Sequence, residues 1–289
     1  MSIALIGSNG QLGQSLSEAM NINGLVFTQY SSEDVNITNL SQVNSIEKPK
    51  LVINTAAYTS VDKAEDEEEK AFAVNKQGVK NLSLFCEKLS IPLIHISTDY
   101  VFDGMSNNPY QENDLAKPLN VYGNSKLAGE LAIQEHCSKF AIIRTSWLFS
   151  TFGSNFFKTM ISLSKKEEVN VINDLHGTPT DANELSAAIL HLISSFIFQS
   201  NFQSRVWHFA GKERMTWFQF ASIIFEEAVK NKLIRNTPII NQISSKSYPA
   251  KAIRPQNSSL NSADFENLLN FKHDDLRSCV NKAIKKISI

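Results

Sequence analysis

The chain has 289 residues, of which 42% are hydrophobic and 20% are charged, so it can bury one large core, or one core and a smaller lobe. A formal net charge of −1 and the lack of a Lys/Arg-rich stretch exclude a global attraction to nucleic acid or anionic lipid. Neither a signal peptide nor the roughly twenty apolar residues of a membrane span stands out, so we expect a cytoplasmic protein that binds neither nucleic acid nor membrane.

Up to about residue 145, short apolar runs alternate with longer amphipathic ones, which is the pattern of β-α-β units around a parallel sheet. Continuously apolar runs are typical of buried parallel strands. We expect strands near Ile3–Ile6, Leu25–Thr28, Leu51–Asn54, Leu93–Ser97 and Ala141–Thr145. We expect helices at Gln11–Met20, Glu67–Leu89 and Val121–His136. The sequence therefore predicts a Rossmann-like, doubly wound α/β fold.

Past Trp147 the pattern changes, and no Gly/Ser linker marks a boundary. We expect helices at Asn155–Lys165, Glu184–Phe198, Trp217–Asn231 and Asp275–Ile287, strands at Val169–Asn173 and Val206–Phe209, and polar turns at Asn241–Tyr248 and Ala252–Ser259. The expected organisation is a dinucleotide-binding domain over residues 1–150, to which some later segments return. Residues 151–289 form mainly a smaller, interleaved substrate-binding lobe, with a cleft between the two parts.

A glycine-rich loop, Gly7-Ser-Asn9-Gly10-Gln11-Leu12-Gly13, follows the first strand and opens the first helix. Gly7 allows a tight turn, Gly10 lets backbone amides approach a pyrophosphate, and Gly13 permits close packing of helix on strand. The alternative is a glycine-rich turn without a ligand. At the end of the second strand, Gln29 is neither the acid of many NAD sites nor the arginine of NADP sites, so NADH and NADPH both stay open.

Tyr122 and Lys126 stand four residues apart, which places both side chains on one face of a helix. A nearby ammonium favours the phenolate and so lowers the pKa of the tyrosine, which suits a proton donor. Alone the spacing is a weak signal, but the phosphate loop upstream supports it. Thr98 ends the fourth strand. It is a candidate catalytic residue, and the alternative is that it only caps the end of this strand.

Several further motifs occur in order along the chain: Val61-Asp-Lys-Ala-Glu65, Ser97-Thr-Asp-Tyr-Val-Phe102, Lys126-Leu-Ala-Gly-Glu130, Arg144-Thr-Ser-Trp147, Gly177-Thr-Pro-Thr180 and Arg254-Pro-Gln-Asn-Ser258. With them the chain resembles the extended short-chain dehydrogenase/reductases and, within these, the dTDP-4-dehydrorhamnose reductase family, over essentially its whole length. The resemblance implies reduction of the C4 keto group of dTDP-4-dehydro-β-L-rhamnose by NADPH or NADH. This is the last step of dTDP-L-rhamnose biosynthesis, which supplies polysaccharide synthesis.

The resemblance also implies roles for individual residues. Tyr122 donates the proton, Lys126 holds the nicotinamide ribose, and Thr98 touches the reacting oxygen. Asp99 and Trp147 contact the sugar nucleotide, a dTDP-4-keto-6-deoxyhexose. The implied cofactor contacts lie in the glycine loop, at Asn36 and Ile37, and at Ala56, Ala57, Tyr58 and Thr59, with Asn75 steadying the sheet nearby.

No resident metal is expected. His95 and His176 have no other ligand at metal-site spacing, and Cys86, Cys137 and Cys279 are too far apart in sequence for a redox or metal pair, which indicates buried, reduced thiols. Some members of the family form a homodimer bridged by Mg²⁺ through glutamates. Here Glu184 matches one of these glutamates but Ser15 replaces another, so such a structural ion is doubtful.

Two alternatives stay open. The first is another sugar-nucleotide reductase, dehydratase or epimerase of the same fold, although a dehydratase is expected to have two acids after Thr98 and only Asp99 is present. The second is a non-catalytic, NADP-binding regulatory subunit, which has no need of Tyr122 as a proton donor.

Overall fold

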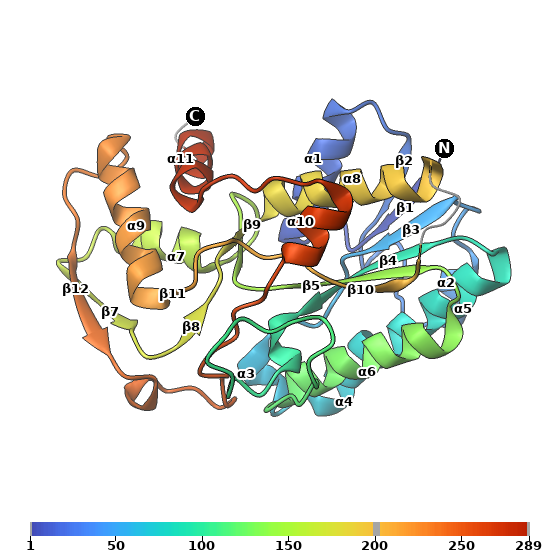
Figure 1. Cartoon of the computed structure of the whole chain (residues 1–289), viewed down its shortest axis with the longest axis horizontal. Helices are drawn as coiled ribbons and strands as arrows, with labels where there is room; N and C mark the ends of the chain where they lie inside the picture. Colours follow the sequence, from blue (N-terminus) through green and yellow to red (C-terminus); the bar gives the residue numbers. More distant parts are fainter. Residues whose placement is uncertain (1, 199–202, 288–289) are drawn as a thin grey trace.

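The computed structural model describes residues 2–198 and 203–287, with a six-stranded parallel sheet at the centre (Figure 1). The strand order is β10-β5-β4-β3-β1-β2. The strands are β1 (Ile3–Ile6), β2 (Phe27–Tyr30), β3 (Leu51–Asn54), β4 (Leu93–Thr98), β5 (Phe140–Thr145) and β10 (Arg205–His208). This arrangement confirms the predicted doubly wound α/β fold. Strand β10 lies after residue 150 in sequence, so a late segment contributes to this sheet.

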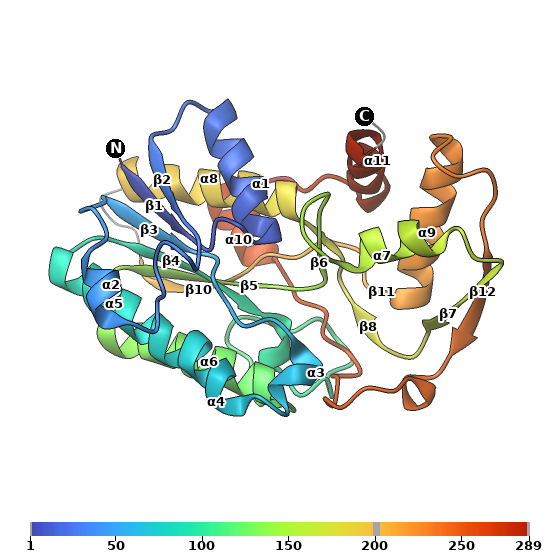
Figure 2. The ribbon, with the colours of Figure 1, turned by 180° about the vertical axis from the view of Figure 1, so that it is seen from behind.

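Helices cover both faces of the sheet (Figure 2). On one face, α1 (Gln11–Ile22), α8 (Ala182–Phe198) and α10 (Ala263–Leu269) enclose one apolar cluster, which includes Leu16, Ile189 and Phe265. On the other face, α2 (Leu40–Asn44), α5 (Val79–Leu89) and α6 (Val121–His136) enclose a second cluster. Each face therefore has its own core, as a sheet with continuously apolar strands requires.

The predicted helix Glu67–Leu89 is a continuous series of three different segments. These are α4 (Glu68–Phe72), a π-helical turn η1 (Ala73–Gly78) and α5, and they follow the short helix α3 (Val61–Ala64). Within the π turn, Asn75 is fully buried and its side chain bonds backbone atoms of Tyr58 and the hydroxyl of Ser125. The wider turn carries a polar contact to α6, and an apolar period cannot reveal such a contact.

Two other segments differ from their predictions. Strand β2 begins two residues later than expected, because its pairing with β1 runs from Phe27 to Tyr30 at a half-exposed sheet edge. Residues 239–243, partly predicted as a polar turn, form strand β12 (Ile239–Ile243). It pairs in parallel with β7 (Glu168–Ile172), which lies about 70 residues earlier in the chain.

The second lobe lies beyond the carboxyl ends of the strands, at the left of Figure 1. Its core is formed by α7 (Phe156–Leu163), α9 (Trp217–Lys230) and α11 (Leu276–Ile287) with β7 and β12. Four short strands form two further pairs: β6 (Leu148–Phe149) with β9 (Thr180–Asp181), and β8 (His176–Gly177) with β11 (Met215–Thr216). Within the described residues, no helix combines the length and apolarity needed to cross a membrane.

Gly129 marks the closest approach of α6 to the π turn, because a Cβ atom there would lie 2.1 Å from the carbonyl oxygen of Asn75. We expect Gly129→Ala to lower the free energy of unfolding by about 1–3 kcal/mol through overpacking, although alanine favours helix. Urea unfolding followed by circular dichroism measures this change. Gln134→Ala on the exposed side of α6 is the matched control, expected within about 0.5 kcal/mol of the wild type. Equal stability of Gly129→Ala would contradict the close contact.

Candidate active site

A cavity of about 980 Å³ opens at the carboxyl ends of β1 to β5, between the sheet and the second lobe. Its walls come from the β1–α1 loop, the ends of β3, β4 and β5, helix α6, and Phe156 and Trp217 of the second lobe. The chain leaves β1 toward β2 on one side and β3 lies on the other side, so the cavity lies at a topological switch point. Open parallel sheets bind their ligands at such points.

The glycine loop has the geometry that a dinucleotide requires. Gly7 has a φ of +81°, and a Cβ atom there would lie 2.5 Å from the backbone nitrogen of Ala56. A Cβ atom on Gly13 would lie 2.3 Å from the carbonyl oxygen of Gly7. Gly10 supplies no side-chain cap to α1, so the first amides of that helix are available to an anion. These residues fit a pyrophosphate.

The cavity brings together almost all of the predicted site residues. Those that line it are Gly7, Asn9, Gly10, Gln11, Leu12, Asn36, Ile37, Ala56, Ala57, Tyr58, Thr59, Thr98, Asp99, Tyr122, Lys126 and Trp147. Gly13 is buried beneath the loop and acts through packing. At the end of β2, the cavity wall includes Ser31 and Ser32. Among the described lining residues Lys126 is the only lysine or arginine, so this wall offers hydroxyl groups and no cation.

Helix α6 carries Tyr122 and Lys126 into the cavity wall. The helix begins at Val121 because Asn120 caps it, with its side-chain oxygen accepting from the Gly123 amide at 2.8 Å. Tyr122 remains partly exposed to the cavity, yet burial raises its pKa to about 12, and a hydrogen bond with Thr98 partly offsets this rise. The predicted lowering of the Tyr122 pKa by Lys126 is therefore wrong for this conformation.

Lys126 is held from the sheet side. Only 2% of it is exposed, and its Nζ donates to the carbonyl oxygen of Ile96 at 2.6 Å. His95 Nε2 lies 3.3 Å from the same Nζ, and His95 Nδ1 lies 2.9 Å from Asn54 Nδ2. Burial lowers the Lys126 pKa to about 8, and the charge of Glu130 works against this effect. His95, predicted as a satisfied histidine, thus contacts a proposed catalytic residue.

Thr98 and Asp99 form a buried hydroxyl and carboxyl network beside Tyr122. Thr98 Oγ1 donates to Asp99 Oδ1 at 3.0 Å, and Ser146 Oγ donates to Asp99 Oδ2 at 2.9 Å. Burial raises the Asp99 pKa to about 6, and hydrogen bonds with Ser258, Ser146 and Thr98 oppose the rise. Ser146 and Ser258 lie in two of the motifs that support the family resemblance, but the sequence gives no role to either, because a serine alone does not indicate its hydrogen-bond partner.

An aromatic stack closes the side of the cavity toward the second lobe. Trp147 has a φ of +45° and stacks on Trp217 of α9, with 3.4 Å between ring centroids. A Cβ atom on Gly177 would lie 2.3 Å from the Trp147 ring, so glycine leaves the space that the indole needs. Trp217 was read from the sequence as part of an amphipathic helix, because an aromatic residue there usually belongs to a core.

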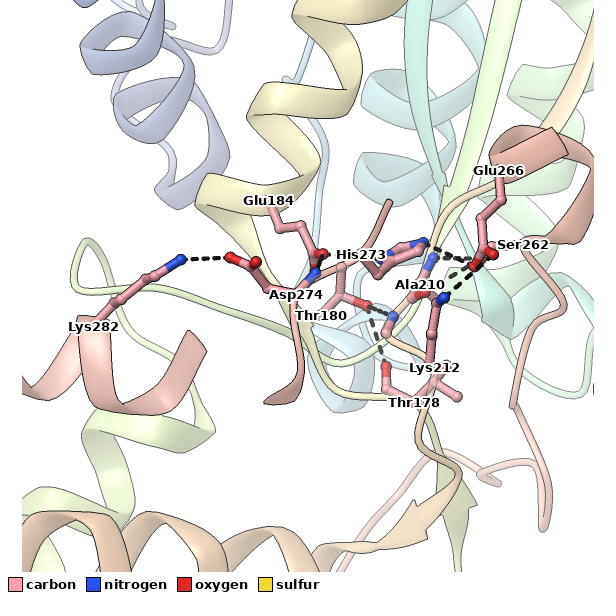
Figure 3. Close-up of polar contacts among 11 residues, drawn as sticks. Thr178, Thr180, Glu184, Ala210, Lys212, Ser262, Glu266, His273, Asp274 and Lys282 are labelled. Carbon is pink, nitrogen blue, oxygen red and sulfur yellow. Dashed lines mark hydrogen bonds and ion pairs between the residues drawn. The ribbon is translucent and has the colours of Figure 1, made fainter. Parts of the chain in front are cut away.

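Glu184 and Ser15, the positions compared with the bridging glutamates, have different surroundings. Glu184 Oε1 accepts from the Asp274 amide at 2.6 Å and lies 3.1 Å from His273 Nδ1, so contacts within the chain occupy it (Figure 3). Ser15 is 1% exposed on α1. Across residues 2–198 and 203–287, no group of three His, Cys, Asp or Glu side chains could hold a metal ion.

Comparison with known families gives a match over the whole chain. The model of the RmlD substrate binding domain matches residues 1–289. The dTDP-4-dehydrorhamnose reductase of Aggregatibacter actinomycetemcomitans is 37% identical over 99% of this chain and 97% of that protein. The enzyme of the same name from Escherichia coli K12 is 37% identical over 92% of this chain and 91% of that protein.

Solved structures of proteins with the same name are also similar to this chain. The dTDP-4-dehydrorhamnose reductase from Bacillus anthracis in complex with NADP has a TM-score of 0.91 at 32% identity, covering 99% of both chains. The orthologue from Clostridium acetobutylicum has a TM-score of 0.92 at 31% identity, covering 100% of both chains. A UDP-glucose 4-epimerase from Thermus thermophilus in complex with NAD has a TM-score of 0.83 at 14% identity over 100% of this chain and 99% of that one, a likeness of fold alone.

The raised pKa of Asp99 makes a prediction about stability. The folded-state value of about 6 exceeds the unfolded value of about 3.9, so the folded protein binds this proton more tightly. The stability that the folded state gains from the proton on Asp99 is therefore fully present below about pH 4 and is lost as the pH rises through 6. Asp99→Asn lacks this titration. We therefore expect the unfolding free energy of the variant minus that of the wild type to increase by about 2–3 kcal/mol from pH 4 to pH 8. Urea unfolding at both pH values tests this, and a constant difference would contradict it.

Proposed function

The chain belongs to the RmlD substrate binding domain family, and we propose that it reduces the C4 keto group of dTDP-4-dehydro-β-L-rhamnose to dTDP-β-L-rhamnose. It is an NAD(P)H-dependent oxidoreductase of the dTDP-4-dehydrorhamnose reductase type. One observation carries the proposed substrate and chemistry: Thr98, Asp99, Tyr122 and Trp147 line the same cavity as the phosphate loop. This shared lining supports placing a sugar nucleotide beside a dinucleotide in the cavity.

We assign the cofactor to the glycine-loop side of the cavity. The free amides at the start of α1 bind the pyrophosphate, and Ala56 and Ala57 leave room along the end of β3. Lys126 anchors the nicotinamide ribose. The bound dihydronicotinamide supplies the hydride that reduces C4.

Tyr122 then acts as the general acid. Its pKa of about 12 keeps the phenol protonated at neutral pH, and the alkoxide that develops on the sugar is a stronger base than a phenolate. Proton transfer from the Tyr122 hydroxyl to the C4 oxygen therefore runs downhill. The high pKa makes the phenol a reliable donor, whereas a low value would leave part of the enzyme without its proton.

Thr98 orients this proton. Its own hydroxyl hydrogen points to Asp99 Oδ1 and its oxygen accepts from the Tyr100 amide at 3.2 Å, so one lone pair is left to accept from the Tyr122 hydroxyl. The sugar carbonyl oxygen is an acceptor, so Thr98 contacts it only by turning its hydrogen from Asp99 to that oxygen. Asp99 and Ser146 fix the rotamer of Thr98 from behind. Trp147, held by its stack on Trp217, gives the apolar wall against which the methyl-bearing face of the sugar packs.

The turnover assay separates this function from its alternatives. We expect purified enzyme to oxidise NADPH or NADH only with the dTDP-4-keto-6-deoxysugar, and NMR of the product to show the C4 configuration of L-rhamnose. A product epimeric at C4 would make the protein a reductase of a different stereoisomer. NADPH binding without consumption of any such sugar would favour a regulatory, non-catalytic role.

Tyr122→Phe tests the proton donor. We expect kcat to fall about 10²–10⁴-fold, the usual contribution of a general acid, with little change in the Kd for NADPH. Tyr248→Phe is the matched control, because Tyr248 is 47% exposed and lies outside the cavity. Full turnover by Tyr122→Phe would exclude the mechanism while leaving the reductase assignment intact.

A further inference from the structure

A buried polar relay joins the sheet to Lys126. It runs from Asn54 at the end of β3 through His95 on β4 to Lys126 on α6, and the exposed fractions of the three residues are 0%, 0% and 2%. The ring nitrogens of His95 face Asn54 Nδ2 at 2.9 Å and Lys126 Nζ at 3.3 Å. Each member therefore has a fixed neighbour and no alternative partner in water.

The hydrogen-bond chemistry assigns the protons of this relay. The backbone N–H of Ala56 only donates, and it donates to Asn54 Oδ1 at 3.0 Å. This bond orients the amide so that Asn54 Nδ2, also a donor only, faces His95 Nδ1. Nδ1 is consequently the acceptor and carries no proton. The single proton of the neutral imidazole is on Nε2, which faces Lys126.

An N–H group on His95 needs an acceptor, and an ammonium has no lone pair. Lys126 satisfies the contact only as a neutral amine that accepts from His95 Nε2–H and donates to the Ile96 carbonyl oxygen. We propose that His95 is a positioning residue that shifts the protonation equilibrium of Lys126 toward the neutral amine, the form that satisfies this contact. The inference rests on the proposed function only where it gives Lys126 a catalytic role.

The charged groups around Lys126 are consistent with a shift of its protonation equilibrium toward the neutral amine. On its own helix Lys126 faces Tyr122 and Glu130, of which Glu130 raises its pKa. Glu130 is itself paired with Arg144 of β5 at 2.7 Å, which reduces its effect on Lys126. From the sheet come His95 and, past the end of β4, Asp99, which raises the pKa of Tyr122. Burial, the largest cause, keeps the pKa of His95 well below its ordinary value, so His95 is neutral whichever form Lys126 takes.

The consequence concerns the upper pH limit of the reaction. Only the ammonium form of Lys126 stabilises a phenolate on Tyr122, and it forms when Nζ takes up a proton from solvent and turns from His95 Nε2–H to other acceptors. His95 favours the neutral amine of Lys126. It therefore lowers the pH above which Lys126 no longer stabilises the Tyr122 phenolate. An imidazole with the opposite tautomer, Nε2 accepting, would favour the ammonium and extend activity to higher pH.

The first test needs no variant. ¹⁵N NMR of the full-length protein labelled at histidine, with His95 assigned from His95→Gln, reports which ring nitrogen carries the proton. We expect His95 to be protonated on Nε2 and bare on Nδ1, and not to titrate in the pH range of an ordinary histidine. A proton on Nδ1 would overturn the proposal. No sugar nucleotide is present, so failure of the proposed function would leave this result unchanged.

The second test reverses the tautomer. In Asn54→Asp the new carboxylate still accepts from the Ala56 amide but now also accepts from His95, which moves the imidazole proton to Nδ1. His95 Nε2 then accepts from Lys126, and we expect the Lys126 pKa to rise by about 1 unit or more. Two measurements report the Lys126 pKa. The first is the ¹³Cε chemical shift of Lys126 as a function of pH, and the second is the alkaline limb of kcat/KM for NADPH, which reports the free enzyme.

Asn44→Asp is the matched control, because it adds the same charge at an exposed position of α2. We expect its Lys126 titration and alkaline limb to coincide with those of the wild type. An Asn54→Asp enzyme with wild-type values for both would overturn the proposal, since a residue of purely structural importance would change stability and leave the pH limit where it is.

Discussion

The buried ion pair between Glu130 and Arg144 is the constraint on which the site depends. Glu130 is 0% exposed, and Arg144 Nη2 and Nε reach it at 2.7 and 3.0 Å, while Ser97 of β4 donates to the same carboxylate. A buried pair with one partner removed typically costs about 3–5 kcal/mol, so the position of α6 on β4 and β5 is strongly determined. Lys126 and Tyr122 lie one and two turns earlier on that helix, and the pair thereby sets where both groups reach the cavity.

A second constraint acts from the other lobe. Trp147 lies two residues after the end of β5 and adopts a left-handed backbone conformation, which is strained for a residue with a large side chain. Its indole packs close to Gly177 and stacks on the Trp217 ring of α9, and these contacts stabilise the strained backbone conformation. The sheet thus positions Tyr122 and the glycine loop, whereas the second lobe positions Trp147. The shape of the cavity depends on how the two parts pack together.

The sequence was sufficient to predict those elements whose pattern lies within a short stretch of residues. Strands β1 and β3, helix α6 and the glycine loop each have a periodicity or a spacing that a short window contains, and their bounds agree with prediction. Long-range contacts left no such trace: β12 becomes a strand only by pairing with β7, and Trp217 joins the site only because α9 packs against Trp147. The π turn at Asn75 follows from a contact with α6, and the role of His95 follows from two partners on different elements.

Burial shapes the electrostatics of the site more than any single pair of charges. It raises the pKa values of Tyr122 and Asp99 to about 12 and about 6 and lowers that of Lys126 to about 8, so each group is pushed toward its neutral form. A weakly charged cavity places little electrostatic penalty on a neutral keto sugar. In the proposed mechanism, the phenolate that forms when Tyr122 gives up its proton is a new buried charge, and a proton on Lys126 compensates it. We therefore propose that proton donation by Tyr122 is coupled to protonation of Lys126, and that the tautomer of His95 sets how readily Lys126 takes up this proton.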